Sequence, residues 1–333
     1  PEEVRRKASL NSSVVPVEYQ GTKYNLIDAP GLFDFETGAC EGVMAAESVL
    51  ICVSGRSGVT VGAEKAYRLA AKNNRARMVF VTKMDLENAD YFKILEQLKI
   101  DFGPTICPCV VPARLDDGTV AYINLFSQKA FKYESGKQIQ IDLPDIGHRF
   151  AGLIEAMNEA IAETDEALME KFFEGEPFTT EEIVSGMAAG VRAGQITPVF
   201  CGSAVNQQAL DMLLYNMKEL LPAADTAAMV GEDAAGEPVE VACDASAPTC
   251  AYVFKTVADP FVGKLSFVKV LGGKLTSTSN VVNSRTGQAE RLGKMLTICG
   301  KKQTDAAAIP AGDIGAVAKL TTAKTGDTLC DPA

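Results

Sequence analysis

The chain has 333 residues, of which 47% are hydrophobic and 23% charged, a composition typical of a folded globular protein with about two domains. No apolar run approaches the roughly 20 residues that a membrane-spanning helix needs, which excludes a helical membrane protein. The 43 acidic and 32 basic residues give a net charge of −11, so the protein is not expected to coat nucleic acid non-specifically.

The first two thirds of the chain alternate apolar runs with amphipathic stretches. We predict strands at residues 24–27, 49–53, 78–81 and 197–201, and helices at 62–73, at 88–100 and from Gln207 to just before Pro222. The strands are mostly apolar instead of alternating, which is typical of strands buried on both faces of a parallel sheet. The pattern predicts a doubly wound α/β domain over residues 1–222.

Residues 104–195 interrupt this alternation and are interpreted as an inserted α+β subdomain. They contain β-like pieces at 119–126 and 138–143, then helical runs at 150–173 and 179–192. A linker rich in Ala, Asp, Glu and Gly is expected at 223–247. From 248 to 333 apolar residues alternate with polar ones between glycine turns, which predicts an antiparallel β-barrel.

The cysteines are scattered and form no CxxC pair. The nine are Cys40, Cys52, Cys107, Cys109, Cys201, Cys243, Cys250, Cys299 and Cys330. We therefore expect reduced thiols in a cytoplasmic protein, without a zinc site or a disulfide framework. The single histidine, His148, has no motif around it and is predicted to lie on the surface of the insertion.

The first predicted strand ends in the sequence Asp-Ala-Pro-Gly at residues 28–31. In nucleotide-switch proteins, an aspartate such as Asp28 holds Mg²⁺ through water, and the amide of a glycine such as Gly31 reaches the γ-phosphate. The alternative is a plain turn, because Asp, Pro and Gly all favour turns.

The third predicted strand ends in Thr82-Lys83-Met84-Asp85. An aspartate in the position of Asp85 can accept hydrogen bonds from guanine N1 and from the exocyclic amine that adenine lacks, while the stem of Lys83 covers the base. The alternative is a solvated loop in which Asp85 caps the next helix.

The fourth predicted strand ends in Cys201-Gly202-Ser203-Ala204. A small Ser-Ala loop lets a backbone amide reach guanine O6, although alone it is a generic strand-to-helix turn. All three motifs follow apolar strands, and the carboxyl ends of such strands are where open α/β sheets bind ligands. Their order predicts a GTPase-type domain. A dinucleotide-binding dehydrogenase would need GxGxxG after the first strand, and none occurs there.

No GxxxxGK[ST] phosphate loop occurs in the chain. Residues 273–276 (GKLT) have the lysine but not the glycine spacing, and residues 54–58 lack the lysine. We expect the first strand and the phosphate loop of the domain to precede Pro1, and this chain by itself to be inactive as a GTPase.

These motifs resemble those of elongation factor G and the related ribosomal translocation GTPases. Residues 6–12 (RKASLNS) resemble the family's RGITIxS switch segment, and 25–35 (NLIDAPGLFDF) its NxIDTPGHVDF. Residues 198–204 (PVFCGSA) resemble its PVxCGSA, and 326–331 (GDTLCD) the end of its second domain. The resemblance implies an α/β P-loop-GTPase-like domain, lacking its first strand and phosphate loop, with an inserted α+β subdomain and a following antiparallel β-barrel.

The resemblance also implies a function: a GTP-binding translation factor that couples GTP hydrolysis to ribosomal translocation. GTP or GDP and Mg²⁺ would be its ligands and the ribosome its partner. Ser9 stands where the family has its Mg²⁺-binding threonine, so Ser9 and Asp28 are the implied metal ligands. Thr82, Lys83, Asp85, Ser203 and Ala204 are the implied base-binding residues. We expect a cytoplasmic monomer without membrane association.

The chain departs from the family pattern at a few positions. Leu32 replaces the histidine that orients the attacking water, so no catalytic residue is assigned; the alternative is that Leu32 packs against Phe33 or Phe35 and a neighbour supplies the contact. Lys7 replaces a glycine, Ser9 a threonine and Thr82 an asparagine. The departures indicate a divergent branch. The alternative function is a ribosome-protection, release or recycling factor that acts as a nucleotide-gated binding module with weak GTPase activity.

Overall fold

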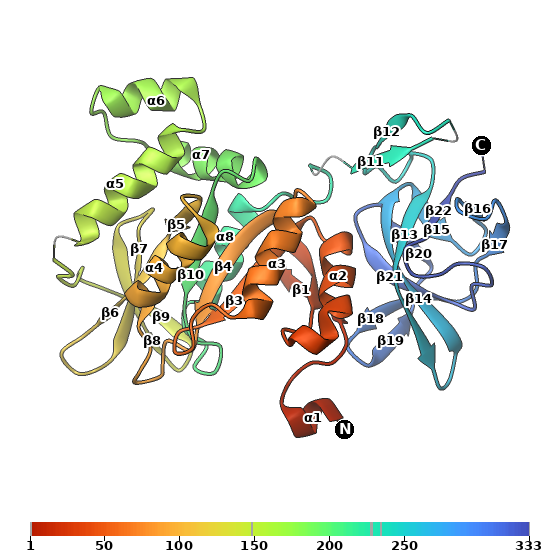
Figure 1. Ribbon diagram of the computed structural model, residues 1–333, viewed down its shortest axis with the longest axis horizontal. Helices are drawn as coiled ribbons and strands as arrows, with labels where there is room; N and C mark the ends of the chain where they lie inside the picture. The colour runs from red at the N-terminus through yellow and green to blue at the C-terminus, as the bar shows by residue number, and fades with distance from the viewer. Residues whose placement is uncertain (1, 148, 227–228, 234, 333) are drawn as a thin grey trace. The chain divides into compact units, whose positions relative to one another are not determined.

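The computed structural model describes residues 2–147, 149–226, 229–233 and 235–332 (Figure 1). The chain forms two compact units. Ser48–Pro222 make up one, here called the sheet unit, and Pro1–Glu47 with Ala223–Ala333 make up the other, the β unit. Our sequence-based division at residue 222 stays a prediction.

The core of the sheet unit is a parallel four-stranded sheet. Its strands, in spatial order, are β3 (Ser48–Ser54), β4 (Ala76–Thr82), β10 (Thr197–Cys201) and β5 (Ile106–Pro108). The apolar residues of β4 and β10 are almost fully buried, as the unbroken apolar runs predicted. The α/β fold class is therefore confirmed.

Helices lie between these strands or follow the last of them, and all but the last begin at a polar cap. They are α3 (Val61–Lys72), α4 (Tyr91–Phe102), α7 (Thr180–Arg192) and α8 (Leu210–Leu220). The Thr60 hydroxyl accepts the amide of Ala63 at the start of α3, and the Asp90 carboxylate accepts that of Lys93 at the start of α4. Figure 1 shows α3 and α4 in front of the strands.

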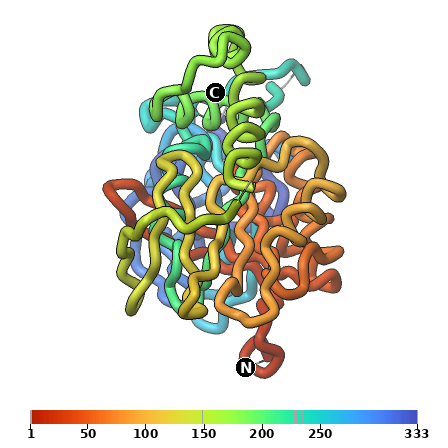
Figure 2. The backbone as a smooth tube through the Cα atoms, turned by 90° about the vertical axis from the view of Figure 1, so that its left-hand side faces the viewer, coloured from red at the N-terminus to blue at the C-terminus, as the bar shows by residue number. Residues whose placement is uncertain are grey.

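Residues 104–195, expected to be an insertion, include β5 of the parallel sheet; the others fold mainly as a four-stranded antiparallel sheet followed by helices, and this part faces the viewer in Figure 2. The strands are β6 (Val110–Arg114), β7 (Val120–Asn124), β8 (Lys129–Glu134) and β9 (Lys137–Ile141), in that order. The pieces expected at 119–126 and 138–143 correspond to β7 and β9. His148 lies outside the described residues.

The helix expected at 150–173 is wrong as a single element. It is divided into α5 (Arg149–Ala162) and α6 (Glu166–Phe173). The cause is Asp165, whose carboxylate accepts the backbone amides of Ala167 at 2.9 Å and Leu168 at 3.3 Å. A side chain that caps a new helix in this way interrupts the preceding one.

The C-terminal part of the β unit is an antiparallel eight-stranded sheet. Its strands are β13 (Cys250–Asp259), β14 (Gly263–Gly272), β16 (Asn280–Asn283), β17 (Ala289–Arg291), β18 (Met295–Cys299), β19 (Lys302–Asp305), β21 (Ile314–Ala318) and β22 (Thr328–Cys330). Two further antiparallel pairs are β15 (Lys274–Thr276) with β20 (Ala308–Pro310), and β11 (Met229–Glu232) with β12 (Pro238–Val241) inside the expected linker. The antiparallel β fold is confirmed.

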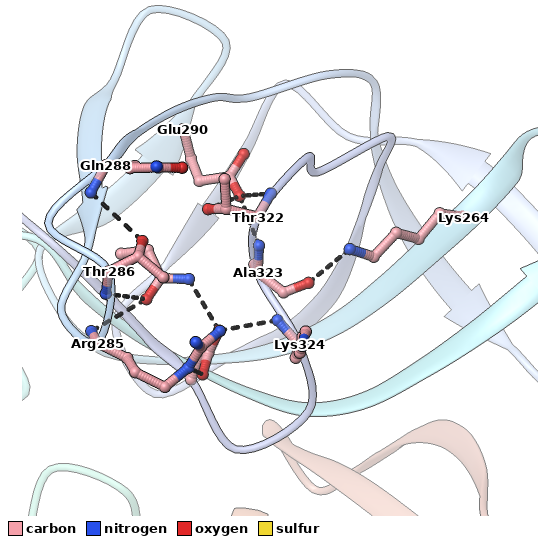
Figure 3. Close-up of polar contacts among 10 residues, drawn as sticks. Lys264, Arg285, Thr286, Gln288, Glu290, Thr322, Ala323 and Lys324 are labelled. Carbon is pink, nitrogen blue, oxygen red and sulfur yellow. Dashed lines mark hydrogen bonds and ion pairs between the residues drawn. The ribbon is translucent and has the colours of Figure 1, made fainter.

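The carboxylates of Glu290 and Asp327 are buried and link the loops of this sheet. Figure 3 shows Glu290 beside its partners Thr322 and Ala323. Glu290 accepts hydrogen bonds from the amides and hydroxyls of Thr321 and Thr322 and from the amide of Ala323, at 2.5–2.9 Å. Asp327 accepts both Nε and Nη2 of Arg285, at 2.7 and 2.8 Å. These bonds from Arg285 hold the pKa of Asp327 far below its usual range.

The N-terminal part of the β unit comprises α1 (Glu2–Arg6), β1 (Ser13–Tyr19), β2 (Thr22–Asp28), the short 3₁₀ helix η1 (Phe33–Phe35) and α2 (Glu36–Ala45). The strand expected at 24–27 exists as β2, but its assignment to the parallel sheet is wrong. It pairs with β1 in a two-stranded antiparallel hairpin. The turn residues Gln20 and Gly21 have positive φ angles of 48° and 76°, which favour a tight hairpin.

The hairpin packs against the C-terminal sheet of the same unit. Val14 is buried in one hydrophobic cluster with Phe254, Leu265 and other residues of that sheet. Lys23 Nζ donates to both carboxylate oxygens of Asp313, at 2.7 and 2.8 Å. These contacts account for the grouping of the first 47 residues with the C-terminal region.

None of the helices in the described ranges has the length and apolar character needed to cross a bilayer.

Candidate functional site

Two of the predicted nucleotide motifs meet at one edge of the parallel sheet. β4 and β10 are neighbours, with Val81 opposite Cys201, so the loops that leave their carboxyl ends lie side by side. The Met84 amide donates to the Gly202 carbonyl across 3.1 Å and joins the two loops directly. The edge carries the candidate base-binding residues of both motifs, as the position of ligands in open α/β sheets predicts.

Asp85 presents an exposed carboxylate in the first of these loops. Lys83 adopts a left-handed conformation with φ of 63°, and Met84 is buried beneath the loop. Asp85 makes no side-chain hydrogen bond within the described part of the chain, and the cap of α4 is Asp90. The alternative in which Asp85 caps the helix is therefore wrong. A carboxylate without an internal partner suits the N–H donors of a base.

In the second loop, Ser203 and Ala204 differ in whether their backbone amides are already hydrogen-bonded within the protein. Ser203 is fully buried and exchanges backbone hydrogen bonds with Gln208, at 2.8 and 3.0 Å. Its hydroxyl accepts the amide of Asn206 at 3.2 Å. Ala204 is exposed, and no described residue accepts its amide. Ser203 thus holds the loop, while the amide of Ala204 is available to a ligand carbonyl.

Sequence reasoning missed two residues that support these loops. The Gly55 amide, just after β3, donates to the Thr82 carbonyl at 2.7 Å, and a Cβ on Gly55 would lie 3.0 Å from that oxygen. Tyr122, in β7 of the insertion, donates its hydroxyl to Gln208 Oε1 at 2.9 Å. A glycine directly after an apolar strand was the available signal for Gly55. No local pattern indicates Tyr122.

The predicted metal ligands Ser9 and Asp28, both in the β unit, lie in direct contact. Ser9 Oγ donates a hydrogen bond to Asp28 Oδ2 across 2.7 Å. Asp28 is exposed at the end of β2, and Gly31, also exposed, has nothing within 4 Å of a Cβ added to it. A hydroxyl and a carboxylate oxygen are the kind of ligand that Mg²⁺ takes, so the donor set fits this ion.

α2 packs directly on the Asp-Ala-Pro-Gly turn. A Cβ on Gly38 of α2 would lie 2.7 Å from Cδ of Pro30, so only glycine allows this approach. Leu32 precedes η1 with 48% of its surface exposed, and it belongs to none of the hydrophobic clusters among the described residues. The Leu32 side chain is therefore not held in place by packing into a hydrophobic core.

A parallel α/β sheet with the motif loops at its carboxyl edge, together with an antiparallel β region, is the architecture of a GTPase-type translation factor. The family model "Elongation factor Tu GTP binding domain" matches residues 1–227, and "Elongation factor G domain 2" matches residues 248–332. The chain belongs to the elongation factor G family, as its motifs indicated.

Individual relatives agree with this assignment. The chain is 33% identical to elongation factor G of Neorickettsia sennetsu over 337 residues, which is 99% of this chain and 48% of the relative. It is 31% identical to the elongation factor G-like protein of Thermotoga maritima over 332 residues, again 99% and 48%. A crystal structure of a Thermus thermophilus protein superposes with a TM-score of 0.85 at 30% identity, covering 99% of this chain and 47% of that one. The chain spans about half the length of the relatives it matches.

Proposed function

We propose that the protein containing this chain binds GTP and GDP and hydrolyses GTP on the ribosome, as a translation factor of the elongation factor G type. The observation that carries the proposal is the pair of loops after β4 and β10, which Met84 and Gly202 join by a hydrogen bond. The Asp85 carboxylate at this edge is exposed and makes no side-chain hydrogen bond to the residues that the structure describes. The names of the curated relatives support the class of activity.

In this proposal the base is recognised by complementary hydrogen bonds. The Asp85 carboxylate accepts from N1–H and the exocyclic amine of guanine, the stem of Lys83 covers the base, and the amide of Ala204 donates to O6. Thr82 and Ser203 hold the two loops in place. Adenine offers neither donor to Asp85, so binding it would leave a desolvated carboxylate unpaired, which is costly.

The phosphate end of the nucleotide is assigned to Ser9, Asp28 and Gly31. Ser9 and Asp28 would hold Mg²⁺, which supplies positive charge to the phosphate oxygens when bound. Ser9 keeps the hydroxyl that the family's threonine provides, and the exposed Gly31 leaves its amide open to the γ-phosphate. We further propose a cytoplasmic monomer whose partner is the ribosome, with translocation as the step it drives.

A second function is favoured by Leu32. The family uses a histidine here to orient water, and an exposed leucine offers no hydrogen bond to that water. The protein could instead act as a nucleotide-gated binding module, in ribosome protection, release or recycling, with weak hydrolysis. Turnover of GTP with and without ribosomes, measured together with ribosome movement along a message, separates the two. Ribosome-stimulated turnover with movement supports translocation, and nucleotide-dependent binding without movement supports the module.

Calorimetry with GDP and ADP on the full-length gene product tests base recognition. The wild type is expected to prefer GDP, and Asp85→Ala to lose about 2–4 kcal/mol of GDP binding. Asp85→Asn should gain affinity for xanthosine diphosphate, because its amide donates where the carboxylate accepts. Asp90→Asn removes the same charge five residues away and retains a good helix cap, so it serves as the control. An unchanged guanine preference in Asp85→Ala would refute the assignment.

A further inference from the structure

Two cysteines of the β unit lie opposite each other on neighbouring strands. Cys250 is the first residue of β13 and Cys330 the last of β22, and the antiparallel register places them directly opposite one another. Both are free thiols and both are half-buried, so a small reagent can approach them.

The hydrogen-bond pattern shows which kind of cross-strand pair they form. The Asp331 amide donates to the Thr249 carbonyl at 2.8 Å, and further along the Val253 amide donates to the Asp327 carbonyl at 2.8 Å. Hydrogen-bonded and non-hydrogen-bonded pairs alternate in an antiparallel ladder. Thr249 and Asp331 form a hydrogen-bonded pair, and the cysteines are the next pair along the ladder. Cys250 and Cys330 are therefore a non-hydrogen-bonded pair.

Non-hydrogen-bonded pairs bring side chains closest together. Their Cα atoms are typically about 4.5 Å apart, which falls at the short end of the range that a disulfide spans. β13 does carry an irregularity between Cys250 and Ala251, but only in its pairing with β14. The pairing with β22 is regular across the cysteines.

No other cysteines oppose each other in a strand register anywhere in the described ranges. The thiols of Cys107, Cys109 and Cys201 belong to one region of the sheet unit but are fully buried, which keeps oxidants away. Cys250 and Cys330 combine close pairing with partial exposure.

We propose that Cys250 and Cys330 form a redox-modifiable dithiol that a low-molecular-weight disulfide, such as glutathione disulfide, converts to a cross-strand disulfide. One cysteine thiolate attacks a sulfur of the glutathione disulfide, forming a mixed disulfide and releasing one glutathione. The thiolate of the second cysteine then attacks the protein sulfur of the mixed disulfide and releases the other glutathione. The two protein thiols lose two electrons and two protons, and the oxidant becomes two thiols.

The surroundings of the pair make this exchange slow. Burial and the neighbouring Cys330 raise the pKa of Cys250 to about 11, and burial and Asp331 raise the pKa of Cys330. Few of these thiols are therefore thiolates at neutral pH, and the thiolate is the attacking form. Once formed, the bond ties the three-residue strand β22 to β13 and prevents its fraying.

Peptide mapping of the chain tests the proposal without any substitution. The chain is equilibrated with glutathione disulfide, quenched with acid and an alkylating reagent, and digested with trypsin without reduction. Trypsin releases residues 219–255, which contain Cys243 and Cys250, and residues 325–333, which contain Cys330. The expected product is these two peptides joined and two hydrogens lighter than their sum, in more than half of the chains.

Two variants identify the bond. Cys243→Ser should retain the joined peptide, whereas Cys250→Ser should lose it and leave Cys330 as a mixed disulfide with glutathione. The proposal is overturned if the exposed Cys40 becomes glutathionylated while residues 325–333 are recovered only unjoined. It is equally overturned if the joined peptide disappears in Cys243→Ser.

Discussion

The ammonium group of Lys255, in β13, donates hydrogen bonds to both the backbone carbonyl and the hydroxyl of Ser12, the latter at 3.0 Å. Lys255 is buried, and Ser12 in turn donates its hydroxyl to Glu41 Oε2 at 2.6 Å. One buried cation thus joins β13 to the segment three residues after Ser9 and to α2. The same contact therefore holds the segment that follows Ser9 and the helix that packs on the turn after Asp28.

The first prediction concerns this contact. Ser12→Ala removes the hydroxyl that bridges Lys255 and Glu41 and leaves the buried ammonium with one acceptor. We expect a loss of about 1–3 kcal/mol in the free energy of unfolding, because a buried charged donor loses a partner. Urea unfolding followed by circular dichroism measures it. Ser13→Ala, one residue further along, is the matched control, and an equal effect in both variants would contradict the assigned role.

The second prediction concerns acid stability and Glu290. Burial alone would raise the pKa of this carboxyl, but the hydrogen bonds from Thr322, Thr321 and Ala323 to its charged form outweigh burial and lower the pKa to about 2. A folded pKa below the unfolded value contributes stability that is complete above the unfolded pKa and is lost as pH falls through the folded one. The contribution is of the order of 2–3 kcal/mol, declining between about pH 5 and pH 2.

Glu290→Gln tests this directly. The substitution keeps the shape but places amide donors against the amides of Thr322 and Ala323, so stability at pH 7 should fall and its dependence on pH below 5 should flatten. Urea midpoints measured at several pH values give both quantities. A variant that retains the full acid dependence of the wild type would show that other carboxylates are responsible.

Much of the sheet unit could be predicted because its signals are local. The apolar runs of β4 and β10 and the polar residues that follow them identify strands, strand ends and the loops that carry Asp85 and Ala204. β8 was missed because Lys129–Glu134 (KAFKYE) shows neither strict alternation of polar and apolar residues nor a continuous apolar run. Its place depends on pairing with β7 and β9, which a single segment does not encode.

The β unit was less accessible to sequence reasoning because its decisive contacts are between distant residues. β2 reads as an apolar strand, but its partner is selected by the turn at Gln20 and Gly21 and by the burial of Val14 against β13 and β14. The contact of Lys255 with Ser12 joins residues far apart in the chain. A lysine within a predicted strand gives no sign of which residue it will contact. The adjacency of Ser9 and Asp28, in contrast, follows from the motifs that the family shares.

The third prediction concerns the loop after β10. A Cβ on Gly202 would lie 2.4 Å from the Gln208 carbonyl and 3.0 Å from Cζ of Phe80, so Gly202→Ala must displace the loop. We expect a loss of about 1–3 kcal/mol in stability and weaker guanine nucleotide binding by the full-length gene product. Gly152→Ala is the control, because nothing lies within 4 Å of that added Cβ and alanine favours the helix. Wild-type stability in Gly202→Ala would show that the loop accommodates the methyl group.

The last prediction concerns hydrolysis. Phosphoryl transfer to water depends on positioning the water and on electrostatic stabilisation, so a side chain beside Gly31 helps only if it can hydrogen-bond to that water. Leu32 offers no such group, and its 48% exposure leaves room for an imidazole in its place. We expect slow intrinsic hydrolysis by the full-length gene product, and a gain of roughly 10²–10⁴-fold in Leu32→His when ribosomes are present.

Single-turnover hydrolysis with and without ribosomes measures the effect, since it separates the chemical step from product release. Leu32→Met is the matched control, because it changes the shape of the side chain without adding a hydrogen-bonding group of comparable strength. A gain in both variants would point to packing as the cause. If the wild type is already stimulated by ribosomes as strongly as a histidine-bearing homologue and Leu32→His adds nothing, then the water is positioned by another residue, and Leu32 has no part in the reaction.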